Sequence, residues 1–340
     1  MRAVVYTHTG DPSVLDLVDK AYPRPGPGEV LVHIHRSGVN PTDWKSRQGS
    51  GSPASVDPPQ TPGQDGAGVV EAVGEGVEAA LTGLRVWVWE AAYHRPEGTA
   101  QELALLPARQ VVTLPDGASF DLGASLGIPF LTAHRCLTVA EDGPHRLGPG
   151  ALAGRTVLVV GGAGAVGNAA IQLARWSDAT VLSTVSSAGK ANAAAAAGAD
   201  HVINYLEQDV VAEIAKIAPH GVDAIVEVAA AANAAIDAQV VGRHGSVAVY
   251  ADQGGGEVTL PIRAFMVPNA RWQFVLVYTE PAQAKAFAVE DVAAAVLDGA
   301  VRVGPEAGLP LHHFPLDRMR DAHLAVQNAT VGKVLIDVTD

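Results

Sequence analysis

Cysteine and long apolar runs are both scarce in this chain of 340 residues. Its single cysteine, Cys136, excludes an intramolecular disulfide and any metal site built from several cysteines. No stretch reaches the ~18–20 consecutive apolar residues of a membrane-spanning helix, and the first residues lack the apolar core of a secretory signal. From these absences we expect a cytoplasmic protein without a membrane partner.

Positive charge is also in deficit. The chain has 23 Lys and Arg against 36 Asp and Glu, a net charge of −13. This balance disfavours an extended nucleic-acid surface, although a few local basic residues can still bind a single phosphate. A chain this long suggests two domains and buries a sizeable core without covalent crosslinks. We therefore expect a two-domain globular protein with no nucleic-acid partner.

The first third of the chain has the pattern of a β-rich domain. Short apolar runs alternate with Gly and Pro clusters, as strands and turns do. These runs lie at residues 3–6, 30–34, 68–73 and 85–89. The segment 49–62 is rich in Gly, Ser and Pro, so we expect it to be an exposed loop that helps to shape the substrate mouth.

The middle of the chain changes to alternating strands and helices. Strands are expected at 156–160, 180–184, 201–204, 224–228 and 246–250, with helices between them that include 164–176 and 190–197. Such alternation predicts βαβ units and a parallel sheet. After residue 267 the pattern reverts to a β-like segment at 271–278, helices at 282–298 and 317–327, and a last strand at 334–338.

These patterns divide the chain into an α/β architecture of two domains. The β-rich domain is expected to consist of residues 1–128 and 271–340. A doubly wound, parallel-sheet nucleotide-binding domain, residues 129–270, is expected between its two parts.

A glycine-rich turn lies between the first expected strand and helix of the middle domain. Residues 157–167 have the sequence VLVVGGAGAVG, whose glycines match the G-x-G-x-x-G pattern. The glycines let the backbone turn tightly and approach a pyrophosphate, toward which the following helix points its N-terminal amides. The cofactor-binding turn is therefore expected to consist of Gly162, Ala163, Gly164, Ala165, Val166 and Gly167. The alternative is a small-residue turn in an alanine-rich protein.

The end of the second strand of this domain indicates which nicotinamide cofactor binds. An NAD site usually has an Asp or Glu there, ~20 residues after the glycines, to hold the ribose 2′-hydroxyl. This chain has no acid from Ala179 through Ala199 and carries Ser186, Ser187 and Lys190 instead. Two hydroxyls and an ammonium suit a 2′-phosphate, which predicts NADPH. The alternative is an exposed polar turn with a solvated lysine.

Motifs spread over nearly the whole chain carry a family resemblance. They are GVNPTD at 38–43, PGQDGAG at 62–68, the glycine turn, GADHVINY at 198–205 and GKVL at 332–335. Together they resemble the zinc-free quinone oxidoreductase (zeta-crystallin-like) branch of the medium-chain dehydrogenase/reductase superfamily. The resemblance implies a GroES-like β-rich catalytic domain beside a Rossmann domain, an active site in the cleft, and a homodimer.

The resemblance also bears on metal binding. Zinc-dependent members of the superfamily carry cysteine where Asn40 stands and His-Glu where Gln64 and Asp65 stand. Both replacements remove good zinc ligands, since zinc favours thiolate and imidazole. The cysteine-rich loop of the structural zinc site is missing too, so no metal is expected.

The resemblance further implies the residues of the site. Asn40 and Thr132 are expected near the nicotinamide, and Tyr205 is expected to help Ser186 and Lys190 hold the 2′-phosphate end. Other residues expected to contact the cofactor are Val228, Ala229, Tyr250, Ala251, the backbone groups of Phe274 and Val275, and Lys333.

Asn40, Gln64 and Lys45 are the catalytic candidates. Many relatives have a tyrosine in the active site shortly after the Asn-Pro motif, where this chain has Trp44 and Lys45. The Lys45 ammonium would stabilise a developing oxygen charge and then donate a proton. In the alternative, Lys45 points to solvent and water supplies the proton.

The expected reaction is hydride transfer from NADPH to a quinone or an α,β-unsaturated carbonyl, two small-molecule acceptors that need no Lewis acid. One alternative is an NADPH-binding structural or redox-sensing protein with little turnover. A remote alternative is a serine hydrolase, because residues 123–127 match G-x-S-x-G around Ser125. That motif needs a strand before the serine, whereas residues 121–133 have a helical pattern.

Overall fold

The computed structural model describes residues 1–339, which form two compact units. Unit 1 comprises residues 1–128 and the segment that begins at Leu311, and unit 2 comprises residues 129–310. The first boundary falls within helix α2 (Phe120–Leu137). No helix among residues 1–339 is long and apolar enough to span a membrane.

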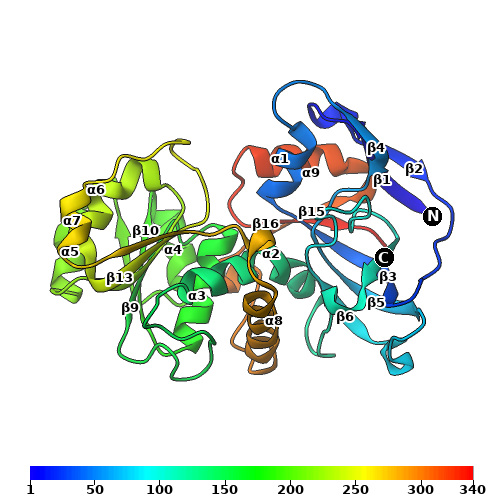
Figure 1. Cartoon of the computed structure of the whole chain (residues 1–340). Coiled ribbons are helices and arrows are strands. Elements are labelled where there is room, and N and C mark those ends of the chain that lie inside the picture. Colours follow the sequence, from blue (N-terminus) through cyan, green and yellow to red (C-terminus); the bar gives the residue numbers. More distant parts are fainter. Residues whose placement is uncertain (340) are drawn as a thin grey trace. The chain divides into compact units, whose positions relative to one another are not determined.

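Unit 1 is the β-rich domain expected from the sequence (Figure 1). Its seven-stranded sheet has the order β15-β16-β3-β5-β6-β8, with β7 paired to β3, and a smaller sheet has the order β2-β1-β4. The strands are β1 (Arg2–His8), β2 (Asp16–Asp19), β3 (Glu29–Val39), β4 (Ser55–Gln60), β5 (Asp65–Val73), β6 (Arg85–Val88), β7 (Leu103–Pro107), β8 (Val111–Thr113), β15 (Leu311–Pro315) and β16 (Lys333–Asp337).

The core of unit 1 follows from the period of its strands. In β3 the alternate residues Val30, Val32 and Ile34 face one side of the sheet and are fully buried. Helices α1 (Pro41–Gln48) and α9 (Met319–Gln327) lie side by side in this unit (Figure 1).

One sequence prediction in unit 1 is wrong in part. The segment 49–62, expected to be a loop, contains strand β4, which pairs antiparallel with β1. Tyr6 lies opposite Gln60, and His8 opposite Ser55. The prolines Pro58 and Pro59 favoured a loop, but β4 is the outermost strand of its sheet, where proline is tolerated.

Unit 2 is a Rossmann domain with six parallel strands in the order β11-β10-β9-β12-β13-β14. The order reverses between β9 and β12, and ligands bind at the carboxyl ends of the strands beside such a reversal. The strands are β9 (Thr156–Val160), β10 (Thr180–Val185), β11 (His201–Asn204), β12 (Val222–Glu227), β13 (Val241–Val249) and β14 (Arg271–Phe274). The helices that follow α2 are α3 (Ala165–Trp176), α4 (Ala188–Ala197), α5 (Val210–Ile217), α6 (Ala230–Val240), α7 (Ile262–Met266) and α8 (Ala282–Leu297).

The second domain boundary differs from the expected one. Strand β14 pairs with β13, with Arg271 beside Ser246 and Phe274 beside Val249. Residues 271–310 therefore extend unit 2, and the β-rich unit resumes only at Leu311. A β-like run after a parallel sheet can extend that sheet or return to another domain, and its local pattern is the same in both cases.

The serine-hydrolase alternative is also wrong. Ser125 lies inside α2 with only 1% of its surface exposed. Its hydroxyl donates a hydrogen bond to the carbonyl of Asp121, 2.7 Å away, one turn earlier in the helix. Residues 120–124, which directly precede Ser125, are helical, so the strand-turn-helix elbow that such a nucleophile needs is missing at this position.

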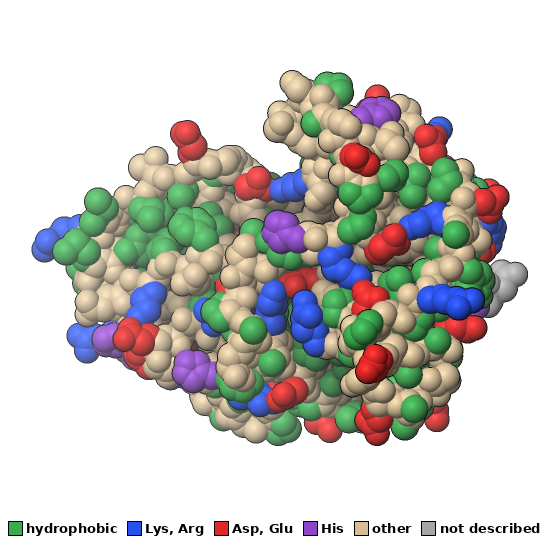
Figure 2. Space-filling model, turned by 45° about the vertical axis from the view of Figure 1, so that its right-hand side comes forward, with side chains coloured by type: hydrophobic (Ala, Val, Ile, Leu, Met, Phe, Trp, Pro, Cys, Tyr) green, Lys and Arg blue, Asp and Glu red, His purple; other side chains and the backbone are tan. Residues whose placement is uncertain are grey.

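Charged side chains are interspersed on the molecular face shown in Figure 2, where acidic and basic residues alternate with apolar ones. No group of three or more His, Cys, Asp or Glu side chains among residues 1–339 is arranged to hold a metal ion.

Candidate cofactor-binding and active site

The glycine turn after β9 is shaped by close backbone packing. Gly161 has φ +73°, a conformation that side chains disfavour. A Cβ atom on Gly162 would lie 2.1 Å from the hydroxyl of Ser183, and one on Gly167 would lie 2.4 Å from the carbonyl oxygen of Gly161. Gly167 therefore cannot carry a side chain unless α3 moves away from the turn, and Gly162 cannot carry one unless the Ser183 side chain moves.

Gly164 differs from these glycines because the space in front of it is open. It is the N-cap of α3, and a Cβ atom there would meet nothing closer than 3.5 Å. The next amides, those of Ala165, Val166 and Gly167, have no preceding carbonyl in the helix to accept their hydrogen bonds and form its positive end. An open, glycine-lined helix N-terminus fits a pyrophosphate, which could approach the backbone closely.

The residues predicted to select NADPH come together at the carboxyl end of β10. The Lys190 ammonium donates a hydrogen bond to the Ser186 hydroxyl, 2.9 Å away. Ser187 is the N-cap of α4, and its hydroxyl accepts the Lys190 backbone N–H at 3.3 Å. Tyr205 follows the neighbouring strand β11, donates its backbone N–H to the carbonyl of Val185 at 3.0 Å, and is 50% exposed. One ammonium, hydroxyls and an exposed ring thus share one edge of the sheet.

The ends of the later strands hold the other predicted cofactor residues. Val228 and Ala229 follow β12, and Tyr250 and Ala251 follow β13. All four are partly exposed at the same edge of the sheet, and the Tyr250 backbone N–H donates to the carbonyl of Glu227 at 3.1 Å.

Phe274 and Val275, expected to offer backbone groups, have two of those groups already bonded. The Val275 N–H donates to the carbonyl of Val249 at 2.8 Å, and the Phe274 carbonyl accepts from the side-chain amide of Gln273 at 2.8 Å. The Phe274 ring is 63% exposed, whereas Val275 is buried.

A buried carboxyl pair that the sequence analysis missed supports the turn after β12. Glu227 is fully buried and accepts hydrogen bonds from the Ala229 N–H and the Asn233 amide. Burial, followed by the charge of Glu227, raises the pKa of Asp237 to about 8. A protonated Asp237 can donate to Glu227, so one proton is shared by the pair. Asn233 and Asp237 stand four residues apart on α6, and this spacing was the available signal.

In unit 1, Asn40 is the centre of a buried polar cluster. Its side-chain amide donates to Asp65 Oδ2 at 2.7 Å, and its carbonyl oxygen accepts from the Lys333 ammonium at 2.8 Å. Lys333 Nζ also lies 3.6 Å from Asp65 Oδ2. The exposed fractions are 3% for Asn40, 0% for Asp65 and 2% for Lys333. We call these three residues the Asn40 cluster.

The order of the strands explains why residues so far apart in sequence meet. Strand β3 lies between β16 and β5, and Asn40 follows directly after β3. The register places Val334 opposite Val39 and Asp65 opposite Gly38. Lys333, the first residue of β16, therefore reaches Asn40 from one side while Asp65 reaches it from the other.

Asp43 lies next to this cluster, at the start of α1. Its carboxylate accepts the backbone N–H groups of Asn40 at 2.7 Å and Gly63 at 3.2 Å. Burial raises the pKa of Asp43 to about 7 and raises that of Asp65, where the Lys333 charge opposes the shift. Burial lowers the pKa of Lys333, against the attraction of both carboxylates.

The other two catalytic candidates are Gln64, which directly precedes Asp65 in the chain, and Lys45 on α1. Gln64 is 7% exposed, and its side-chain oxygen accepts the Ala92 N–H at 3.2 Å. Lys45 lies on the exposed face of α1, with its ammonium 6.0 Å from the centre of the Trp44 ring. Thr132, in unit 2, is buried on α2. The structure thus joins Asn40 directly to Lys333 and Asp65.

Comparisons with known proteins match both units. A family model described as an alcohol dehydrogenase GroES-like domain matches residues 26–116, and one described as a zinc-binding dehydrogenase matches residues 165–294. The quinone oxidoreductase of Lama guanicoe is 32% identical over 340 residues, which cover 99% of this chain and 97% of that protein.

Solved structures share the fold over the full length. A mycobacterial protein, Rv1454c, in complex with NADPH is 26% identical with a TM-score of 0.80 over 99% of both chains. An NAD-dependent alcohol dehydrogenase is also 26% identical, with a TM-score of 0.83 over 100% of both chains. The family resemblance seen in the motifs is thereby confirmed: this chain belongs to the quinone oxidoreductase branch of the medium-chain dehydrogenase/reductase superfamily.

Proposed function

We propose that this protein is an NADPH-dependent reductase that delivers hydride to a quinone or an α,β-unsaturated carbonyl without zinc. A relative of matching length is a quinone oxidoreductase, and a structural neighbour was solved with NADPH. The observation that carries the proposal is the Asn40 cluster. In it the Lys333 ammonium contacts Asn40, which stands where zinc-dependent members of the superfamily have a cysteine, and Asp65, which stands where they have the glutamate of His-Glu.

The nucleotide site fits NADPH. The pyrophosphate would lie at Gly164 and the first amides of α3, because this is the open, positive end of that helix. The 2′-phosphate would meet the Lys190 ammonium and the Ser186 hydroxyl, with Tyr205 beside them. The chemistry that NADPH supplies when bound is hydride transfer from its nicotinamide ring.

The Asn40 cluster fits zinc poorly. The Asn40 carbonyl oxygen already accepts a hydrogen bond from the Lys333 ammonium, and a second cation this close would be repelled. The group contains neither thiolate nor imidazole, the ligands that zinc prefers. The buried ammonium instead supplies the positive charge that balances Asp65.

The cluster also orients the amide of Asn40. Because Lys333 donates only and ionised Asp65 accepts only, the carbonyl oxygen must face the lysine and the amide nitrogen must face the aspartate. One N–H of that amide is not used by Asp65. We propose that it assists at the nicotinamide or at the acceptor oxygen, where negative charge grows as hydride arrives.

Steady-state kinetics test the proposed function. We expect the purified protein to oxidise NADPH with a small quinone or an enone faster than it oxidises a primary alcohol with NADP⁺. Binding of NADPH without turnover of any acceptor would favour the structural or sensing alternative. Faster turnover of the alcohol, with stoichiometric zinc in the protein, would overturn the proposal.

We also propose a homodimer formed through strand β14 and a cytoplasmic location. Strand β14 is the last strand of its sheet, and within residues 1–339 no strand pairs with its outer edge. Phe274 and Leu276 on and after this strand are 63% and 52% exposed. Light scattering should give twice the chain mass, and a Phe274→Lys variant should shift toward the monomer. A monomeric wild type at micromolar concentration would contradict the proposed assembly.

A further inference from the structure

A buried arginine on α1 has no acidic partner. Arg47 is 1% exposed, and its guanidinium donates to the carbonyl of Gly10 at 2.9 Å and to the side-chain oxygen of Gln327 at 3.2 Å. Both acceptors are neutral. Among residues 1–339 no carboxylate lies within ion-pair distance of Arg47, and its Nε has no hydrogen-bond partner. Arginine keeps its charge in proteins, and buried charges are normally paired.

The groups around this guanidinium do not supply the missing negative charge. His323 lies one turn before Gln327 on α9, and burial together with the Arg47 charge lowers its pKa to about 3, so it is neutral. Burial raises the pKa of Tyr6 to about 12, so the phenol is neutral too. Asp11 is the acid within electrostatic reach, but its exposed carboxylate accepts the Ser13 N–H at 2.7 Å.

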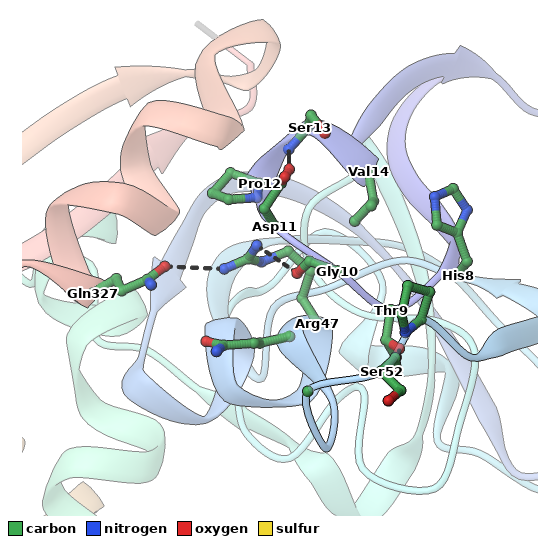
Figure 3. A pocket seen from close by; sticks show the side chains of 13 residues that line it. His8, Thr9, Gly10, Asp11, Pro12, Ser13, Val14, Arg47, Ser52 and Gln327 are labelled. Atoms are coloured by element: carbon green, nitrogen blue, oxygen red, sulfur yellow. Dashed lines mark hydrogen bonds between the residues drawn. The ribbon is translucent and has the colours of Figure 1, made fainter.

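Arg47 also lines a cavity of about 490 Å³, within the usual range for small-molecule sites. The walls come from residues 8–14, the end of α1, the loop at residues 51–53, and Gln327 (Figure 3). In Figure 3 the guanidinium lies between the Gly10 carbonyl and Gln327, with the Ser52 and Thr9 side chains on the opposite wall. The cavity thus joins a buried cation to polar groups in a space that admits a small organic molecule.

We propose that this cavity is a second binding site, for a small oxyanion whose carboxylate or phosphate group pairs with Arg47. The planar guanidinium matches the geometry of both groups. A bound anion would supply the negative charge that the neutral acceptors, the Gly10 carbonyl and the Gln327 side chain, do not supply. The site lies wholly within unit 1 and does not depend on NADPH. Asp11 opposes the bound anion, because its negative charge lies at the same cavity.

The test uses the full chain without NADPH and two probes, inorganic phosphate and malonate, against sodium chloride at equal ionic strength. We expect either oxyanion, but not chloride, to raise the melting temperature and to give a saturable calorimetric titration. Whichever of the two probes binds more tightly, phosphate or malonate, shows whether the site prefers a phosphate or a carboxylate group. An equal response to chloride and to both oxyanions would overturn the proposal.

Three variants make the test specific. Asp11→Asn keeps the capping ability of residue 11 and removes its charge, so it should bind the oxyanion about threefold or more tightly, the effect of one unit charge several ångströms away in water. Asp116→Asn makes the same change in net charge at an exposed position outside the cavity and should leave the affinity unchanged. Arg47→Gln should abolish binding.

Arg47→Gln also removes buried hydrogen bonds and can destabilise the fold. The affinity of Asp11→Asn for the oxyanion is therefore the measurement that tests the location of the site. An affinity that is the same in wild type, Asp11→Asn and Asp116→Asn would show that the anion binds elsewhere and would overturn the proposal. In the wild type, an Nε–H resonance of Arg47 that moves on titration would confirm the contact directly.

Discussion

Removing the Lys333 ammonium should leave the buried carboxylate of Asp65 without a positively charged partner. In Lys333→Met the side chain keeps most of its length, but Asp65 loses its cationic neighbour at 3.6 Å while remaining fully buried. Breaking a buried ion pair from one side typically costs about 3–5 kcal/mol, because the remaining charge is uncompensated. We therefore expect the free energy of unfolding to fall by about this amount at pH 7. Urea denaturation with an unchanged m-value measures it.

The partner variant separates charge from packing. Adding Asp65→Asn to Lys333→Met removes the unpaired carboxylate. The free energy of unfolding should then recover by at least about 1 kcal/mol, since contacting charges couple by roughly 0.5–3 kcal/mol in double-mutant cycles. Lys216→Met is the matched control: its side chain is 66% exposed and forms an ion pair with Glu213, three residues earlier on the same helix. That change should cost less than about 0.5 kcal/mol. A similar small loss in Lys333→Met, or strictly additive losses in the double variant, would refute the reasoning.

Three further predictions follow from the site. Lys190→Ala should weaken NADPH binding about ten- to a hundred-fold and leave NADH nearly unchanged, as expected for a lost charge-assisted contact; titration of both cofactors checks this, and equal losses would remove Lys190 from the 2′-phosphate site. The Asp237 pKa of about 8 lies above its ordinary value of 3.8, so the native state keeps a proton that the unfolded chain has lost, and stability should fall by up to about 1.4 kcal/mol per pH unit as pH rises between those values. Asp237→Asn does not titrate, so its gain over wild type should be larger at pH 8 than at pH 5, and parallel pH profiles would contradict the shared proton. If Lys45 donates the proton, Lys45→Met should lower kcat at least about tenfold at unchanged NADPH affinity, since general-acid help typically contributes about 10²–10⁴-fold; a loss of less than about threefold would show that Lys45 takes no part in the chemistry.

Features encoded by adjacent residues could be predicted from the sequence. The glycine turn at Gly162, Gly164 and Gly167 needs only a strand before it and a helix after it, and both are visible in the local pattern. Ser186 and Lys190 are likewise four residues apart, and the structure brings them together as expected.

Features that depend on strand order could not be predicted. Asn40, Asp65 and Lys333 meet because β3 lies between β16 and β5, a neighbour relation that no local pattern encodes. The sequence analysis accordingly named Lys333 as a cofactor contact and did not connect it with Asn40. The sequence analysis placed residues 271–274 in the β-rich domain for the same reason, since the pairing of β14 with β13 in the Rossmann sheet depends on tertiary contacts.

The fate of the transferred hydrogen tests the central claim most directly. NADPH carrying deuterium at both C4 positions should be incubated with the purified, zinc-analysed protein and a small enone, and the product examined by mass spectrometry. Hydride transfer predicts one deuterium on the β-carbon of the reduced product, formed by protein with well below one zinc per chain. Reduced product without deuterium, or deuterium transfer that requires stoichiometric zinc, would contradict the account.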